Sequence, residues 1–442
     1  MPGPKPNAVE PDLKLPKAVD VVVIGGGIIG ASTALELSER GMSVLLCEKG
    51  QIASEQSSRN WGWVRLGMRD PREIPLMQES QRIWAQLDQR TGRKTGFTQA
   101  GILFGASGKR EQSNLERWLR HVEGLNTGAR MVSGALLAEL MPDHQTGLDC
   151  ALFMPQDGRA EPQWAAPAIA EAARDRGALL MTNCAVRCLD TEADRVVGVF
   201  TERGRVACGN VVLAGGAWSR LFAGNAGVDF PQLKVLNTVF RTSPVSGPEA
   251  ALWSDDFAIR KRDDGGYTIA SGHENTVDIV PDSLRLAWQF LPAFRQEWRS
   301  LRFRVSKRWA EEARQDRRWL PTDVTPFELC RTLDPEPSRR VLRRAWKSAI
   351  SGIPALKQAE IVQSWAGMID VTPDAIPIIS HVDHRPGLFI ATGFSGHGFG
   401  IGPGAGRLMA DLVSGNVSCV NPAVFRLSRF ADGSKIRPDP GY

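Results

Sequence analysis

The first regular pattern in the chain is a short run of apolar residues that leads into a cluster of glycines. Residues 19–24 read VDVVVI, and an unbroken β-branched run of this length predicts a strand buried on both faces. GGGIIG and ASTALELSERG follow, and the apolar spacing of the second segment predicts a helix that ends near Gly41. The next run, MSVLLCEKG, predicts a second strand with Glu48 at its carboxyl end. This order of elements predicts a βαβ unit.

The glycines of the first turn have the GxGxxG spacing of a nucleotide-binding turn. Gly25 allows a tight exit from the strand, Gly27 leaves room for a pyrophosphate, and Gly30 lets the helix pack closely on the strand. The helix N-terminus then offers unpaired N–H groups to phosphate oxygens. Glu48 stands where a carboxylate accepts both hydroxyls of an adenosine ribose and repels a 2′-phosphate. The unit therefore favours FAD or NAD over NADP.

Two later glycine-rich crossings extend this pattern. Residues 210–214 predict a strand that runs into Gly215, and residues 388–392 predict a strand that opens through glycines into a helix from about 403 to 414. Between these and the first unit, the stretch after Gly50 is polar and punctuated by glycine, as expected of a loop that follows a long cofactor. This pattern favours FAD over NAD.

Composition restricts the class of protein further. The 442 residues are 42% hydrophobic and 23% charged, with a net charge of +5, which is ordinary globular composition that leaves room for two domains. Seven scattered cysteines without a CxxC pair indicate free thiols in a reducing compartment, with neither a disulfide framework nor a metal site. No apolar run approaches 18 residues, so we expect no transmembrane helix. The cytoplasm is the expected location, with peripheral contact on the inner face of the membrane as an alternative.

On these motifs the chain resembles the D-amino-acid-oxidase-like superfamily of FAD-dependent oxidoreductases, which includes glycine oxidase, sarcosine oxidase and D-amino-acid dehydrogenase. The matching pieces lie in the family's order between residues 19 and 415: VVVIGGGIIGASTALELSERGMSVLLCEKG, SSRNWG, VVLAGGAWS, WAGMIDVTPDAIPIIS and ATGFSGHGFGIGPGAG. The resemblance implies an α/β fold with a Rossmann-like FAD-binding domain built from discontinuous segments and an α+β substrate domain with an antiparallel sheet. The expected segments are a disordered tail (1–18), the FAD-binding domain (19–66, 150–222 and 357–425) and the substrate domain (67–149 and 223–356).

The same resemblance implies which residues hold the cofactor. The diphosphate would be bound by Gly25, Gly27, Ile28 and Gly30. The ribose would be bound by Glu48, the adenosine would lie near Lys49 with its adenine at Val186, and one side of the cofactor would be closed by Gly215. The diphosphate and flavin would be lined by Ser57, Ser58, Arg59, Asn60 and Gly62, and the isoalloxazine rim by Gly393, Phe394, Ser395, Gly396, Gly398, Phe399 and Gly400. Gly367 stands where relatives carry a cysteine bonded to FAD, and SSRNWGWVR lacks the histidine that others use. Noncovalent FAD is therefore expected.

The resemblance also implies oxidation of the C–N bond of an amino acid or N-substituted amino acid to an imine, with hydride transfer to flavin N5 and later hydrolysis to the oxo acid or aldehyde. Thr268 replaces a lysine that promotes reaction with oxygen in relatives, so O2 and a quinone both stand as electron acceptors. A flavin dehydrogenase of a 2-hydroxy acid is the alternative enzyme. A third hypothesis is a flavoprotein that acts mainly through a membrane- or RNA-binding segment.

A substrate with a carboxylate requires an anchor, and the planar fork of an arginine binds two oxygens at once. Arg65 is the first candidate, by its place after the flavin-contacting loop; the alternative is a surface charge at a helix start. Arg69 is a second candidate, and Arg59 could serve the substrate or the diphosphate. Two roles are open for His397: a place beside the flavin, as the resemblance implies, or a structural hydrogen bond. Two roles are also open for Tyr267: contact with the substrate or packing in the core. The candidate catalytic set is thus Arg65, His397 and Tyr267.

Residues 285–347 form an insertion in which tryptophan and arginine alternate, including Trp288, Trp298, Trp309 and Trp319. One interpretation is a helical face packed on the substrate domain with its arginines in solvent. A second is attachment to an anionic membrane surface, where tryptophan and arginine are both favoured. Binding of RNA or DNA is the least favoured, because no known nucleic-acid-binding motif accompanies the segment.

Overall fold

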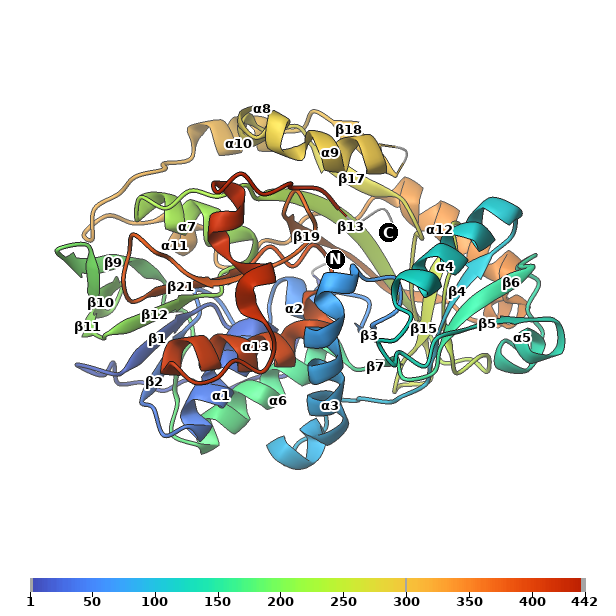
Figure 1. The fold of residues 1–442 in the computed structure, drawn as a ribbon, viewed down its shortest axis with the longest axis horizontal. Helices are drawn as coiled ribbons and strands as arrows, with labels where there is room; N and C mark the ends of the chain where they lie inside the picture. Colours follow the sequence, from blue (N-terminus) through green and yellow to red (C-terminus); the bar gives the residue numbers. More distant parts are fainter. Residues whose placement is uncertain (1–2, 299, 439–442) are drawn as a thin grey trace.

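The computed structural model describes residues 3–298 and 300–438, which fold around two large sheets (Figure 1). The first sheet has six strands in the order β20-β21-β12-β1-β2-β8. Its five parallel strands are short and buried, as the unbroken apolar runs predict, and β20 pairs antiparallel with β21. The strands are β1 (Val21–Ile24), β2 (Val44–Cys47), β8 (Leu179–Met181), β12 (Asn210–Leu213), β20 (Ile378–His381) and β21 (Leu388–Thr392).

Helix α1 (Ile28–Glu39) packs against α6 (Pro162–Asp175) and α13 (Gly398–Ser414), and α13 also contacts α3 (Ile74–Thr91). The predicted start of α13 near residue 403 is wrong, because its glycine-rich first turns are helical. Those glycines allow close helix packing: a Cβ at Gly404 would lie 2.7 Å from the carbonyl oxygen of Leu76. The helix N-terminus therefore stands five residues closer to the strand that precedes it.

The second sheet has ten strands and is mostly antiparallel, with β19 paired to β13 beside the path β18-β17-β13-β16-β15-β14-β4-β6-β5. This confirms the predicted fold class of a Rossmann-like α/β domain joined to an antiparallel one. The predicted boundaries need correction, since β6 and β19 pair in this sheet although we expected them in the FAD-binding segments. The strands are β4 (Ile102–Ala106), β5 (Arg130–Ser133), β6 (Cys150–Met154), β13 (Leu233–Thr242), β14 (Ala251–Trp253), β15 (Ala258–Lys261), β16 (Tyr267–Ala270), β17 (Asn275–Asp278), β18 (Leu301–Arg304) and β19 (Ile361–Val371).

Smaller elements complete the fold around these sheets. Three consecutive strands, β9, β10 and β11, form a small antiparallel sheet, and the pairing of β3 with β7 connects distant segments. Helices α4 and α12 contact the ten-stranded sheet. The elements are β3 (Trp63–Val64), β7 (Gly158–Arg159), β9 (Val186–Glu192), β10 (Arg195–Thr201), β11 (Gly204–Ala207), α2 (Gln56–Arg59), α4 (Lys109–His121), α5 (Gly134–Leu140), α7 (Ser219–Asn225), α11 (Pro326–Leu329) and α12 (Arg339–Gly352). Five short 3-10 helices lie at residues 71–73, 216–218, 354–358, 422–425 and 427–430.

The N-terminal segment is packed, which corrects the prediction of a disordered tail over residues 1–18. Val9 is buried in the main core. The backbone N–H of Asn7 donates to the carbonyl oxygen of Gln163 at 2.9 Å, and Ala18 forms a bridge with Ala207. Backbone hydrogen bonds to α6 and β11 thus order a stretch whose composition alone favours disorder. Residues 1 and 2 lie outside the described part of the chain.

The first part of the insertion projects from the molecule as a separate layer, drawn in gold at the top of Figure 1. It consists of α8 (Pro281–Arg285), α9 (Ala287–Glu297), β18 and α10 (Arg308–Arg314). None of the eleven residues of α9, all of which the structure describes, is buried, and Trp288 is 85% exposed. The expectation of an apolar face packed on the substrate domain is therefore wrong for α9, whereas α12 does bury such a face. Across the described residues, no helix has the length and apolarity needed to cross a membrane.

Candidate active site

A cavity of about 800 Å³ takes its lining from both sheets, and its volume is in the upper part of the range of about 300–1,000 Å³ for ligand sites. Glu48 directly after β2 and Val186 at the start of β9 line it on one side, and Phe104 and Trp253 line it from the ten-stranded sheet. Carboxyl ends of parallel strands are where doubly wound sheets bind ligands. All three glycine-rich crossings that the sequence predicts contribute residues to the lining, from within residues 25–29, 213–216 and 394–400.

The turn between β1 and α1 leaves no room for side chains. A Cβ at Gly30 would lie 1.9 Å from the carbonyl oxygen of Gly25, so only glycine allows the helix to start this close to the strand. Helix α1 has no side-chain cap and no acidic residue in its first turn. The N–H of Ile28 donates to Ser57 Oγ at 2.8 Å. Gly25, Gly27 and Ile28 thus line the cavity at a helix N-terminus suited to an anion.

The carboxylate of Glu48 is fixed by two backbone donors. The N–H groups of Gly26 and Gly50 each donate to one of its oxygens at 2.7 Å, and burial raises the pKa of Glu48 above its ordinary value. Each carboxylate oxygen keeps lone pairs that can accept further hydrogen bonds. This arrangement suits the two hydroxyls of a ribose, as the sequence predicts.

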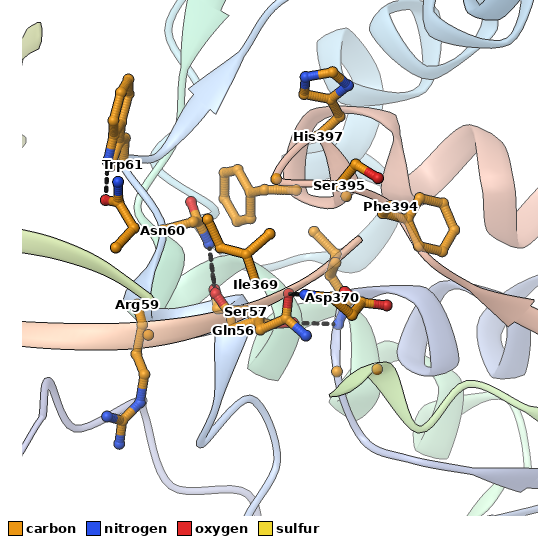
Figure 2. A pocket seen from close by; sticks show the side chains of 18 of the residues that line it. Gln56, Ser57, Arg59, Asn60, Trp61, Ile369, Asp370, Phe394, Ser395 and His397 are labelled. Carbon is orange, nitrogen blue, oxygen red and sulfur yellow. Dashed lines mark hydrogen bonds between the residues drawn. The ribbon is translucent and has the colours of Figure 1, made fainter. Parts of the chain in front are cut away.

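The loop around α2 carries five predicted cofactor residues with different placements. Ser57 and Asn60 line the cavity, and Asn60 closes the loop by donating to the carbonyl oxygens of Gln56 and Ser57. Figure 2 shows the guanidinium of Arg59 directed away from this group, and it binds Asp334 and the carbonyl oxygen of Ala366. Ser58 is fully buried and Gly62 packs against Arg260, and neither lines the cavity. Three of the five residues, Ser57, Arg59 and Asn60, therefore line the cavity.

The glycine-rich loop before α13 is held by Asp370 on β19. One oxygen of this carboxylate accepts hydrogen bonds from Gly393 N at 2.6 Å, Thr392 Oγ1 at 3.0 Å and Gln232 Nε2 at 3.0 Å. Phe394, Ser395, Gly396, Gly398, Phe399 and Gly400 line the cavity, whereas Gly393 lies behind it. The N-terminus of α13 also lacks a side-chain cap. A second helix terminus suited to negative charge therefore faces the cavity.

The His397 ring points away from the centre of the cavity (Figure 2). Its Nδ1 lies 3.4 Å from Glu73 Oε2, and Arg69 NH1 lies 3.6 Å from the same oxygen. Burial, with the charges of Arg69 and Arg65, holds the pKa of His397 well below its ordinary value, so the imidazole is neutral. Burial raises the pKa of Glu73. His397 thus lines the cavity while its Nδ1 faces the carboxylate of Glu73.

Arg65 lines the cavity directly after β3. Its guanidinium donates to the carbonyl oxygen of Gly67 at 2.9 Å and lies 5.9 Å from the Phe104 ring. The turn that carries it is held by Asp157, which accepts from the N–H groups of Leu66 and Gly67 at 2.7 and 3.0 Å. Burial raises the pKa of Asp157 to about 6. Arg65 is thus a cavity-facing cation with donors left for a carboxylate.

A row of aromatic rings lines the cavity beside Arg65. Centroid distances are 5.2 Å from Trp61 to Trp63, 6.4 Å from Trp63 to Phe104, 6.5 Å from Phe104 to Trp253 and 4.9 Å from Trp253 to His273. Such edge and tilted contacts are the favoured arrangements of aromatic pairs. The row gives this part of the cavity an apolar wall.

Tyr267 is not part of this site. Its ring is buried in the core of the ten-stranded sheet, and its hydroxyl donates to the carbonyl oxygen of Pro248 at 3.1 Å. Burial raises the pKa of its phenol. Of the two roles that the sequence allows, the geometry supports core packing.

Other residues of the site were missed from the sequence. Trp253, His273 and Phe327 carry no local motif, and they reach the cavity through strand pairing or loop packing. A signal for Asp370 exists, since it lies in the segment IDVTPD that supports the family resemblance. Lys49, Val186 and Gly215, which the sequence predicts to contact the cofactor, line the cavity.

The residues present fit FAD. Two uncapped helix N-termini, a ribose-type acceptor at Glu48 and an apolar wall occur along one continuous cavity. A mononucleotide would need only one helix N-terminus and the ribose acceptor. A molecule with a nucleotide, a diphosphate and a flat ring uses them all.

Comparison with known proteins agrees with this fit. Residues 20–412 match the family DAO, described as FAD dependent oxidoreductase. The L-amino acid deaminase from Proteus myxofaciens, solved in complex with anthranilate, superimposes with a TM-score of 0.93 at 32% identity and covers 97% of this chain and 98% of that one. Glycine oxidase from Geobacillus kaustophilus is 26% identical over 93% of this chain and 97% of its own length.

A longer relative matches only in part. The 4-methylaminobutanoate oxidase (formaldehyde-forming) of Paenarthrobacter nicotinovorans is 27% identical over 94% of this chain but 46% of its own length. The chain therefore spans less than half of that curated relative.

Proposed function

The chain belongs to the DAO family of FAD-dependent oxidoreductases, and on that premise we propose that it oxidises the C–N bond of an amino acid, or N-substituted amino acid, that carries a large apolar side chain. The family prediction made from the sequence is thereby confirmed, as is FAD as the cofactor. The observation that carries the proposed substrate is the position of Arg65 beside the aromatic row within the cavity that fits FAD.

The residues of the cavity have distinct parts in this proposal. The guanidinium of Arg65 binds the substrate carboxylate, and Trp63, Phe104 and Trp253 contact its side chain. Bound flavin supplies the acceptor for the hydride from the substrate carbon. What the protein contributes is the orientation of that carbon and the exclusion of water. The imine that results is hydrolysed by water to an oxo acid and an amine or ammonia.

We further propose that FAD is held without a covalent bond and reoxidised by an acceptor other than O2. Gly367, which lines the cavity, has no side chain to form a bond with the cofactor. Among the described residues that line the cavity, the one lysine is Lys49, beside Glu48. Thr268, which stands where relatives carry the lysine that promotes reaction with oxygen, is buried on β16 outside the lining. A quinone is the favoured acceptor.

Contact of the insertion with an anionic membrane surface would bring such an acceptor within reach. Residues 281–318 contain ten arginines and lysines against five acidic residues. Trp288 and Trp298 are 85% and 54% exposed. Exposed indole rings with an excess of cationic groups suit the interface of anionic lipids. The alternative ligand of this surface, RNA, lacks the support of any nucleic-acid-binding motif.

Anaerobic titration of the purified protein tests the proposed function. Bleaching of the flavin absorbance by phenylalanine, leucine or their N-methyl derivatives is expected, with little effect of glycine, sarcosine or the matching 2-hydroxy acids. Bleaching by hydroxy acids alone would establish the alternative dehydrogenase. Under air, reduction of an added quinone or dye without hydrogen peroxide is expected, and stoichiometric peroxide would contradict the proposed acceptor.

A further inference from the structure

A middle part of the insertion, residues 319–334, leaves the outer layer and folds over the FAD-binding domain. In Figure 1 the chain after α10 runs down one side of the molecule toward β9 and β10 and returns through α11, beside α7. We call residues 319–334 the capping arm. The sequence places it in the substrate domain, so its contacts with the other domain are unexpected.

The capping arm contributes Phe327 to the cavity wall. Phe327 is 4% exposed, and its ring centroid lies 5.9 Å from those of Trp218 and Phe222 and 5.4 Å from that of Trp319. Trp218 and Phe222 line the cavity together with Phe327 and Val186. An apolar wall from two domains therefore encloses the part of the cavity that lies next to Glu48.

Polar contacts fix the first half of the arm to β9. The carboxylate of Glu328 binds Arg187 through two hydrogen bonds of 3.0 and 2.8 Å. Arg187 also donates to the carbonyl oxygen of Pro321 at 3.1 Å, and Trp319 Nε1 donates to that of Arg187 at 2.7 Å. Arg187 follows Val186 directly, so these contacts hold the arm at the expected adenine position.

A second set of contacts fixes the arm to the turn after Glu48. Lys49 Nζ donates to the carbonyl oxygens of Cys330 and Arg331 at 2.8 and 3.0 Å, and Arg331 binds both oxygens of Glu202 at 2.5 and 2.6 Å. A Cβ at Gly50 would lie 2.4 Å from the carbonyl oxygen of Arg331, so the arm packs directly on this turn. Arg331 keeps 34% of its side chain exposed, which makes it a surface latch.

We propose that the capping arm is the outer wall of the adenosine end of the FAD site and that FAD leaves only when the Arg331–Glu202 latch opens. A noncovalent cofactor needs contact area to be retained, and Phe327 adds apolar area that the FAD-binding domain does not supply by itself. Lys49 then acts at this end as the anchor of the arm, which explains why its ammonium group is directed to backbone carbonyls. The inference rests on FAD binding and not on the identity of the substrate.

The dissociation rate of FAD from the holoenzyme tests this inference. Release is followed by the rise of FAD fluorescence after the holoenzyme is diluted to a concentration at which rebinding is negligible, with no amino acid present. Phe327→Ala is expected to release FAD at least tenfold faster than the wild type, and Arg331→Ala several-fold faster. Trp288→Ala and Arg340→Ala are the matched controls from the exposed part of the insertion and are expected to release FAD at the wild-type rate.

A Phe327→Ala protein that keeps its FAD as long as the wild type would overturn the inference, and so would an equal acceleration in the two controls. If Phe327→Ala does not fold, Arg331→Ala decides alone, because its side chain lies at the surface, and an unchanged rate for it would overturn the inference. A failure of every amino acid to bleach the flavin would refute the proposed function and leave these rates unaffected.

Discussion

Arg69 NH2 donates a hydrogen bond of 2.9 Å to the carbonyl oxygen of His397, and through it the loop that carries Arg65 is joined to the glycine-rich loop before α13. Arg69 Nε donates at the same time to the carbonyl oxygen of Arg65 at 2.7 Å. Arg69 is fully buried. Arg69 also lines the cavity, and through these two hydrogen bonds it positions the candidate carboxylate anchor against the expected flavin position.

Removing the guanidinium of Arg65 is expected to weaken substrate binding without loss of FAD. A hydrogen bond to a charged group contributes about 1.5–3 kcal/mol, so Arg65→Ala should raise KM about ten- to a hundredfold. The visible spectrum should stay that of bound flavin. Steady-state kinetics with the best amino acid measure the effect, and Arg82→Ala, a 72% exposed arginine on α3, is the control. An unchanged KM would remove Arg65 from the site.

Shortening Trp253 is expected to change specificity rather than overall activity. Loss of one aromatic wall should lower kcat/KM for phenylalanine about tenfold or more, while the value for alanine should change little. The ratio of the two substrates in Trp253→Ala and in the exposed control Trp288→Ala provides the measurement. Equal losses for both substrates would contradict a side-chain contact at Trp253.

Loss of the Asp370 carboxylate is expected to release the loop before α13. Asp370→Ala removes three hydrogen bonds. Gln232 and Thr392 can still donate to the carbonyl oxygen of Gly216, whereas the buried N–H of Gly393 loses its acceptor, and a buried unsatisfied group costs about 1–3 kcal/mol. The apparent Tm of the holoenzyme should fall by several degrees, and FAD should be lost on gel filtration. Asp383→Ala, whose carboxylate is 69% exposed, serves as the control. A stable yellow Asp370→Ala protein would show that the loop is held by other contacts.

His397 is expected to make folding sensitive to acid. Burial and the charges of Arg69 and Arg65 depress the pKa of His397 in the folded protein. Below the pKa of a free histidine, about 6.5, His397 therefore binds a proton in the unfolded chain but stays neutral in the folded protein. The stability that neutral His397 contributes is present above that pH and is lost as the pH falls, by up to about 1.4 kcal/mol per pH unit. The apparent Tm of the wild type minus that of His397→Asn should therefore shrink from pH 7.5 to pH 5. Exposed His384 gives the control His384→Asn, for which the difference should stay constant.

The exposed insertion is expected to bind vesicles that contain phosphatidylglycerol and not vesicles of phosphatidylcholine alone. The double change Trp288→Ala with Trp298→Ala should abolish cosedimentation at physiological salt, because the indole rings supply the apolar contact. Val417→Ala, which removes a 96% exposed apolar residue outside the insertion, is the control. Retention of the wild type by RNA but not by vesicles would reverse the choice of ligand.

Much of the nucleotide half of the site could be predicted because its determinants are local. The strand, turn and helix around Gly25, Gly27 and Gly30 lie within 21 residues (19–39) of the sequence, and the required backbone geometry restricts the residue types. The same applies to the strand 388–392, which is found at the predicted bounds. By contrast, Arg59 could not be assigned, because its partner Asp334 is 275 residues away.

The sequence by itself determined the cofactor class and the α/β fold, since glycine spacing and apolar runs act over a few residues and leave few backbone alternatives. The tertiary structure alone decided that Tyr267 packs in a core, that Trp253 and Phe327 reach the cavity, and that the end of the insertion covers the FAD-binding domain. These outcomes depend on contacts between segments far apart in the chain, and such contacts are set by the packing of whole surfaces rather than by any local pattern.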